Sequence, residues 1–177
     1  MPDDFETALM SLRHAHRPRT LLFSEAQAPT TLAPWAATLN VETVAQNHHC
    51  PLATGSFVVL YDPHSQVGWN ALFRLVVTMR AQVDHDMITN PLMGEVVWNW
   101  THDCLKQAGA GFHDITGTVT REISESFGRV SLAVSSLNVE LRASWSPNTP
   151  YLGEHLDGFG LLLCRTAGIM PVATFGK

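Results

Sequence analysis

The segment from residue 71 to residue 83 constrains the fold most strongly, because its apolar and polar side chains alternate. In an extended chain one face would carry Phe73, Leu75, Val77 and Met79, and the other Arg74, Val76, Thr78 and Arg80. A period of two residues is that of a β-strand with one buried face. The chain is therefore predicted to contain a sheet whose apolar face is covered by other elements.

Further strands and helices are predicted on both sides of this strand. Strands are expected at residues 39–43, 54–61, 115–123 and 138–145, and a short strand is a further option at 20–23. Helices are expected at residues 3–17, 90–108 and 151–167. The loops between neighbouring strands are too short for parallel crossovers. This order predicts a single α+β domain over residues 1–177, with two layers: helices packed on one face of a mostly antiparallel sheet of five or six strands.

Charged residues are scarce. Asp, Glu, Lys and Arg make up 15% of the 177 residues, against about 25% in ordinary soluble domains, while the hydrophobic content is 45%. Of the 11 basic residues only Lys106 and Lys177 are lysine, so a lysine-covered surface is missing. We expect the few charges to lie on a face that another molecule covers. The formal net charge of -5 argues against direct nucleic-acid binding.

Three features predict a cytoplasmic protein. The first residues, Met-Pro-Asp-Asp, are acidic where a secretory signal is basic. No apolar run is long enough to span a bilayer, so we expect no membrane partner. The cysteines, Cys50, Cys104 and Cys164, are isolated and odd in number, which is typical of a reducing compartment.

Two clusters carry side chains that bind metals or move protons. His48-His49-Cys50 is the more ligand-like, but adjacent residues on a strand or turn point apart, and a polar hairpin tip explains the cluster equally. Asp84-His85-Asp86 contains a general-base pair, but its place between a strand and a helix favours a loop. The sequence contains no nucleophile elbow and no phosphate-binding glycine loop. We therefore predict no catalytic residue, no metal and no cofactor.

The polar face of the sheet is the predicted binding surface. The residues assigned to it as binding residues are Arg74, Arg80, Glu140 and Arg142, and Trp98 is added because it lies off the apolar stripe of its helix. The alternative for the sheet residues is a solvated face with cross-strand ion pairs. The alternative for Trp98 is a position at the rim of the hydrophobic core. Arg121 has the parity of buried neighbours, so either a bulge shifts its strand or a partner satisfies it beneath a helix.

Several stretches resemble a known family. They are, in order, YDPHSQVGWNALFRLVVTMRAQV, NPLMGEVVWNWTHDCLKQAGA, GTVTREISESFG, LRASWSP and LGEHLDGFGLLLCRTAG. They resemble an actinobacterial family of intracellular proteins, a domain of unknown function, over roughly residues 20–170. The resemblance carries over no catalytic residue. The element order is also similar to that of type III secretion chaperone-like domains, which dimerise and hold extended segments of partners, although the extra segment at 20–23 departs from that order.

Three functional hypotheses follow. The first is a non-enzymatic protein-interaction or adaptor module, chaperone-like and homodimeric, that binds an unknown protein through its polar sheet face. The second is a small-molecule-binding protein or enzyme with a pocket between the sheet and the helices, and with Asp84, His85 and Asp86 near its mouth. The third is an accessory protein of RNA metabolism, which the family resemblance implies because members are encoded near a ribonuclease D-like protein.

Overall fold

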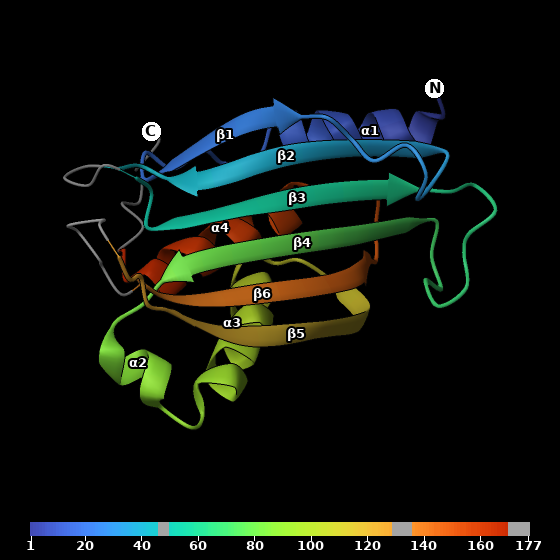
Figure 1. Ribbon diagram of the computed structural model, residues 1–177. Helices are drawn as coiled ribbons and strands as arrows, with labels where there is room; N and C mark the ends of the chain where they lie inside the picture. Colours follow the sequence, from blue (N-terminus) through green and yellow to red (C-terminus); the bar gives the residue numbers. More distant parts are fainter. Residues whose placement is uncertain (46–49, 129–135, 170–177) are drawn as a thin grey trace.

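Six strands form one antiparallel sheet in the computed structural model, which describes residues 1–45, 50–128 and 136–169 (Figure 1). The strands are β1 (Leu21–Ala26), β2 (Trp35–Thr43), β3 (Ala53–Tyr61), β4 (Phe73–Gln82), β5 (Phe112–Ser124) and β6 (Ser136–Pro147). Their order across the sheet is β1-β2-β3-β4-β6-β5. The described helices are α1 (Asp3–Arg13), α2 (His85–Thr89), α3 (Met93–Gln107) and α4 (Gly153–Ala167).

The α+β fold predicted from the sequence is confirmed, with six antiparallel strands. Figure 1 shows α1, α3 and α4 behind the sheet, and the opposite face without a helix over it. The optional strand at residues 20–23 forms as the edge strand β1 and pairs with β2. No helix in the described part of the chain is both long enough and apolar enough to cross a membrane.

Some boundaries differ from the expectation. The first helix ends at Arg13 rather than residue 17, and His14 after it has left the helical conformation, with φ -92° and ψ 1°. A short helix, α2, replaces the loop expected around residues 84–86. Asp84 caps it, since its Oδ1 accepts a hydrogen bond of 2.7 Å from the Met87 N–H. Five residues are too few to produce a helical period in the sequence.

The core lies between the sheet and α4. Leu156, Phe159 and Leu163 of α4 are buried against the inner face of β3 and β4. Phe159 lies so close to Gly55 of β3 that a Cβ atom there would come within 2.6 Å of the Phe159 Cζ. This close contact explains why a glycine stands at an inward-facing position of a central strand.

A polar pair is buried inside this core. The indole Nε1 of Trp145 donates a hydrogen bond of 2.9 Å to Nδ1 of His155, whose side chain is only 2% exposed. The bond requires an unprotonated Nδ1, so His155 is neutral in the folded protein. Burial lowers the pKa of His155 to about 4.

Candidate ligand-binding groove

The polar face predicted from the sequence exists with the expected strand parity. Arg80 and Glu140 face each other across β4 and β6, and Thr78 faces Arg142 in the same way. Arg80 forms an ion pair with Glu122, and the Nε of Arg142 lies 2.6 Å from the Glu140 Oε1. Arg80, Glu140 and Arg142 line a shallow hollow of about 420 Å³ at the middle of this face. These charges are therefore paired within the chain, and binding of a protein partner here stays a prediction.

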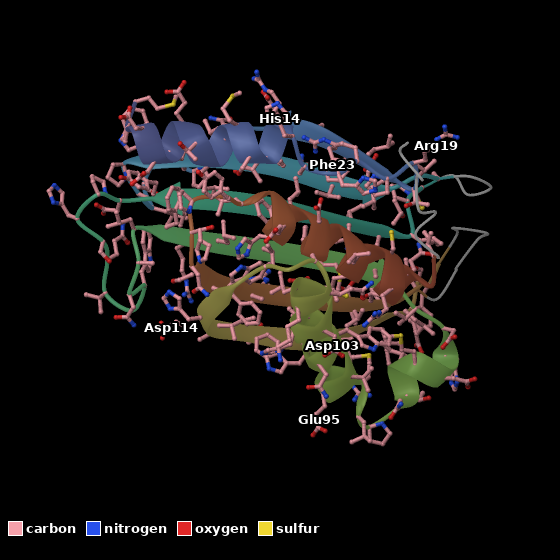
Figure 2. All side chains as sticks on the ribbon, turned by 180° about the vertical axis from the view of Figure 1, so that it is seen from behind. His14, Arg19, Phe23, Glu95, Asp103 and Asp114 are labelled. Atoms are coloured by element: carbon pink, nitrogen blue, oxygen red, sulfur yellow. The ribbon has the colours of Figure 1, made fainter. Side chains whose placement is uncertain are left out.

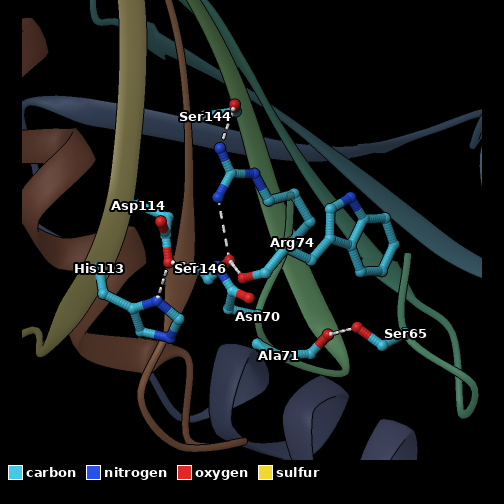
Figure 3. A network of polar contacts seen from close by, with 9 residues as sticks. Ser65, Asn70, Ala71, Arg74, His113, Asp114, Ser144 and Ser146 are labelled. Atoms are coloured by element: carbon cyan, nitrogen blue, oxygen red, sulfur yellow. Dashed lines mark hydrogen bonds and ion pairs between the residues drawn. The ribbon is translucent and has the colours of Figure 1, made fainter. Parts of the chain in front are cut away.

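Arg74, the fourth polar residue predicted to bind, lies between β4 and the serines of β6 (Figure 3). It is only 8% exposed, and its guanidinium donates hydrogen bonds of 2.9 Å to the hydroxyls of Ser144 and Ser146. The Ser146 hydroxyl in turn donates to the Trp69 carbonyl at 2.5 Å. Burial lowers the pKa of Arg74, while the charge of Asp114 acts in the opposite direction. Arg74 therefore links β4 to β6, and Ser146 extends the same network to the loop between β3 and β4.

A second set of contacts fixes the same loop to the start of β5 (Figure 3). The Asp114 Oδ2 accepts a hydrogen bond of 3.2 Å from the Asn70 amide and lies 2.6 Å from the His113 Nδ1. These hydrogen bonds lower the pKa of Asp114. Asn70 and Asp114 have φ angles of 49° and 53°, a left-handed conformation that Asn and Asp tolerate better than most residues. These contacts hold Asn70 and Asp114 in this conformation and connect the loop to the start of β5.

Arg74 is expected to matter for stability far more than the exposed arginines. We predict that Arg74→Met lowers the free energy of unfolding by about 2 kcal/mol, because one buried and one partly buried hydrogen bond from a charged donor are lost. The matched control Arg142→Met removes an exposed ion pair and should lower it by less than about 1 kcal/mol. Urea unfolding of the two variants measures both values. Equal losses would show that the hydrogen bonds of Arg74 contribute no more stability than an exposed ion pair.

Trp98 of α3 and Arg121 of β5 both lie on the helix side of β5. Trp98 is half-buried and packs on Gly117, where a Cβ atom would come within 2.5 Å of the Trp98 Cζ3. Arg121 donates hydrogen bonds of 2.8 Å to the Ile88 carbonyl and 3.0 Å to the Pro91 carbonyl. Of the two alternatives for Arg121, the structure supports the partner at a helix. The register of β5 and β6 is shifted only between His113 and Thr116.

The two ligand-like clusters have different outcomes. His48 and His49 lie outside the described residues, and Cys50 is exposed. Within residues 1–45, 50–128 and 136–169 no group of three His, Cys, Asp or Glu side chains is placed to hold a metal ion. Asp84 acts as the cap of α2. Neither Asp84 nor the two residues after it line the cavities that lie beside β1 on the helix side of the sheet.

The structure contains a groove on the helix side of the sheet, and its lining residues were not predicted from the sequence. This α1–β1 groove has a volume of about 680 Å³, within the range of small-molecule sites. Its lining comes from α1, from the turn after α1, from β1 and from β2. The apolar part includes Leu9, Leu12, Phe23, Ala37 and Leu39. All except Leu12 are only partly buried against the core, so apolar surface is left open along the groove.

A smaller pocket adjoins the groove. This Asp157 pocket has a volume of about 370 Å³ and is lined by residues of α4, the C-terminal end of α3 and the segment before β1. It shares Pro18, Leu21 and Phe23 with the groove, so the two spaces lie on either side of the same side chains. On α4 its wall is formed by Asp157, Gly160 and Cys164, which follow one another at helical spacing.

Packing between α1 and α4 positions the pocket. The Ser11 hydroxyl accepts a hydrogen bond of 2.7 Å from the Leu152 N–H, at the start of α4. Gly153 packs so closely on α1 that a Cβ atom there would lie 2.9 Å from the Ser11 carbonyl oxygen. The pocket is lined by His16 and Pro18 of the turn after α1 and by residues of α4 that follow this contact.

Basic side chains gather at the end of α1, next to the groove. Residues 13–19 read Arg-His-Ala-His-Arg-Pro-Arg, three arginines and two histidines in a chain of net charge -5. Arg13 and Arg17 line the groove, and Arg17 stacks over the Phe23 ring at 4.5 Å from its centre. Seen from behind, Phe23 lies beside this end of α1 (Figure 2). Among the described residues neither arginine forms an ion pair with a carboxylate.

Asp157 is the acidic group of the adjoining pocket. Its Oδ1 is buried and has no hydrogen-bond partner among the described residues. Burial raises the pKa of Asp157, whereas the charge of His16 and a hydrogen bond from the His16 backbone lower it. Buried carboxylate oxygens normally have partners, so an unpartnered one beside a pocket requires an explanation.

The fold and the groove define the chain as an α+β protein with a small-molecule-sized, mostly apolar cavity between α1 and the strands β1 and β2. A family model described as a protein of unknown function (DUF3000) matches residues 1–175, and the chain belongs to this family. A search of curated proteins and a search of solved structures each found no significant match. The actinobacterial origin and the likeness to type III secretion chaperones stay predictions.

Proposed function

We propose that the protein binds a single-chain anionic amphiphile, such as a long-chain carboxylate, in the α1–β1 groove. The observation that carries this proposal is the position of Arg13 and Arg17 in the lining of an apolar groove, where neither forms an ion pair with a carboxylate of the described residues. An alkyl chain would cover the open apolar surface at Leu9, Phe23 and Leu39. The anionic head would pair with Arg13 and Arg17.

Charge and shape both favour this ligand class over a purely apolar one. Arg13 and Arg17 are exposed, and a carboxylate forms charge-assisted hydrogen bonds with them that a fully apolar molecule cannot form. Glu25 also lines the groove and is exposed, so it can remain in water when the ligand is bound. The proposal makes the protein a binding module, and it requires no catalytic group.

Titration calorimetry with dodecanoate, below its micelle-forming concentration, tests the proposal. We expect saturable binding at one site. The Arg13→Gln, Arg17→Gln double variant should bind about tenfold more weakly, a loss of about 1.4 kcal/mol of binding free energy. Arg19→Gln is the matched control, because Arg19 belongs to the same basic segment and does not line the groove. It should bind dodecanoate with unchanged affinity.

The uncharged analogue dodecanol separates the head from the chain. If Arg13 and Arg17 recognise the anionic head, the double variant and the native protein should bind dodecanol equally. No saturable binding of dodecanoate, or equal weakening by the Arg19 variant and the double variant, would rule out the proposed site.

A further inference from the structure

The strand β5 forms an open edge of the sheet, at the end opposite to the α1–β1 groove (Figure 1). Among the described strands β5 pairs with β6 on one side and has no strand on the other. It contains 13 residues, whereas the other edge strand, β1, contains 6. The outward N–H and C=O groups of a long edge strand are a template for pairing with another chain.

The strand β5 lacks the usual means of preventing such pairing. It contains neither lysine nor proline. Its register with β6 is regular from Thr116 to Ser124, after the shift between His113 and Thr116. Thr116, Thr118 and Thr120 are exposed and β-branched, which favours extended backbone. The regular part of β5 is therefore suited to backbone hydrogen bonds with a further strand.

The helices leave the core-facing side of β5 partly open. On β6, Val139 and Leu141 are completely buried on this side. Val119 of β5, which pairs with Leu141, is only half-buried, and Ile123 on the same side is 60% exposed. The apolar side of a sheet is ordinarily covered by another element. The two side chains therefore indicate where a neighbouring strand would pack.

The strand is complementary to itself when two copies pair antiparallel. A two-fold axis at Val119 places the valines of both copies side by side, a favourable β-branched pair. On the outer side Thr118 then faces Thr120 of the second copy, and such threonine pairs are favourable. Thr116 faces Glu122 of the second copy, and no two like charges are opposite each other. A second copy thus supplies a suitable partner for each of these positions.

The same register accommodates Arg121, whose side chain lies on the helix side and donates to two carbonyls of the segment around α2. A charge that points inward on an edge strand ordinarily opposes pairing. Here the position opposite Arg121 is Gly117 of the second copy, which is exposed and has no side chain. Ile123 lies beside Ile115 of the second copy, so its exposed apolar surface becomes covered.

We propose that two copies of this chain associate through antiparallel pairing of their β5 strands, which joins the two sheets into one continuous sheet. A closed two-fold contact uses the β5 edge of both copies, so no third copy adds there. The α1–β1 groove lies at the other end of the sheet and stays open in both copies. The inference therefore goes beyond the proposed function and does not depend on it.

Sedimentation velocity at a series of protein concentrations tests the association. We expect a reversible monomer–dimer equilibrium for the native protein. Ile123→Lys places a charge on the paired edge and should weaken dimerisation at least about tenfold. Leu22→Lys is the matched control, because Leu22 is an exposed residue of the other edge strand, and it should dimerise as the native protein does. Both replaced side chains are exposed, so both variants are expected to fold, which circular dichroism checks.

Disulfide trapping tests the register of the two strands. The background variant is Cys50→Ser, because Cys50 is an exposed cysteine. With copper-phenanthroline as the oxidant, Val119→Cys should form a disulfide between copies, since the two side chains face each other across the axis. Thr116→Cys is the control: it faces Glu122 of the second copy and should stay uncrosslinked. Non-reducing electrophoresis measures both variants.

The outcomes decide whether a second copy is the occupant of this edge. A strict monomer at about 1 mM would overturn the proposal and leave the edge to an extended segment of a different protein. A dimer that is unaffected by Ile123→Lys, or crosslinking of Thr116→Cys in place of Val119→Cys, would show that two copies meet elsewhere or in another register.

Discussion

Acidification from pH 6.5 to pH 4 is expected to cost the native protein about 3 kcal/mol of stability through His155 alone. The folded pKa of about 4 lies below the ordinary value of 6.5, so the unfolded chain binds more protons than the folded one between these values. Stability from this residue is fully present above pH 6.5 and is lost as the pH falls toward 4. Each pKa unit corresponds to about 1.4 kcal/mol, which sets the size of the effect.

The variant His155→Gln isolates this contribution. A glutamine side-chain oxygen can still accept the hydrogen bond from the Trp145 indole, but it does not titrate. Urea unfolding at a series of pH values should therefore give a shallower loss of stability for His155→Gln than for the native protein. His64→Gln, in an exposed loop, is the control and should follow the native profile. Parallel profiles for all three proteins would show that His155 is not kept neutral by burial.

Asp157 has the opposite effect on the pH dependence of stability over part of the same pH range. Its folded pKa is raised above 3.8, so the folded protein binds the extra proton and this residue favours stability as the pH falls toward 3.8. The contribution of Asp157 cancels when the unfolding free energies of the native protein and His155→Gln are subtracted at each pH, because both proteins contain Asp157. The comparison therefore measures His155 alone.

Filling the groove is expected to have the largest effect on binding. Ala37 lies on the helix-facing side of β2, is half-exposed and lines the groove, so Ala37→Trp should place an indole where the alkyl chain would lie. We predict at least a tenfold loss of dodecanoate affinity. Since the site is open rather than packed, stability should change by less than about 1 kcal/mol.

A control on the opposite face makes this result specific. Thr78→Trp introduces the same side chain at an exposed position of the polar sheet face. It should leave dodecanoate binding unchanged, and calorimetry measures both variants. Equal binding by Ala37→Trp and the native protein would mean that the ligand does not occupy the groove.

The sheet could be predicted from the sequence because its information is local. Alternation along β4 and β6 determines which side chains share a face, and antiparallel pairing then places Arg80 beside Glu140. The same reasoning could not show that Arg74 is covered. That depends on a loop whose buried Trp69 packs outside the main core, and no periodic pattern in the sequence marks such a contact.

The groove depends on contacts between segments far apart in the chain. Its walls, and those of the adjoining pocket, come from α1, β1, β2, α3 and α4, which no short motif joins. One signal was present: residues 13–19 hold three of the nine arginines in an acidic chain. No such sequence signal marks Asp157, because a single acidic residue in an apolar helix is ordinarily exposed.

Chemical-shift mapping of the ¹⁵N-labelled protein with dodecanoate tests the central claim most directly, because it locates the ligand without any substitution. The account predicts saturable shifts concentrated in the backbone amides of residues that line the groove, such as Leu9, Leu12, Arg17 and those at 21–26 and 36–39. Residues of the polar sheet face, such as Thr78, Arg80 and Arg142, should not shift. Shifts concentrated on that face, or no saturable shifts in the groove, would contradict the account.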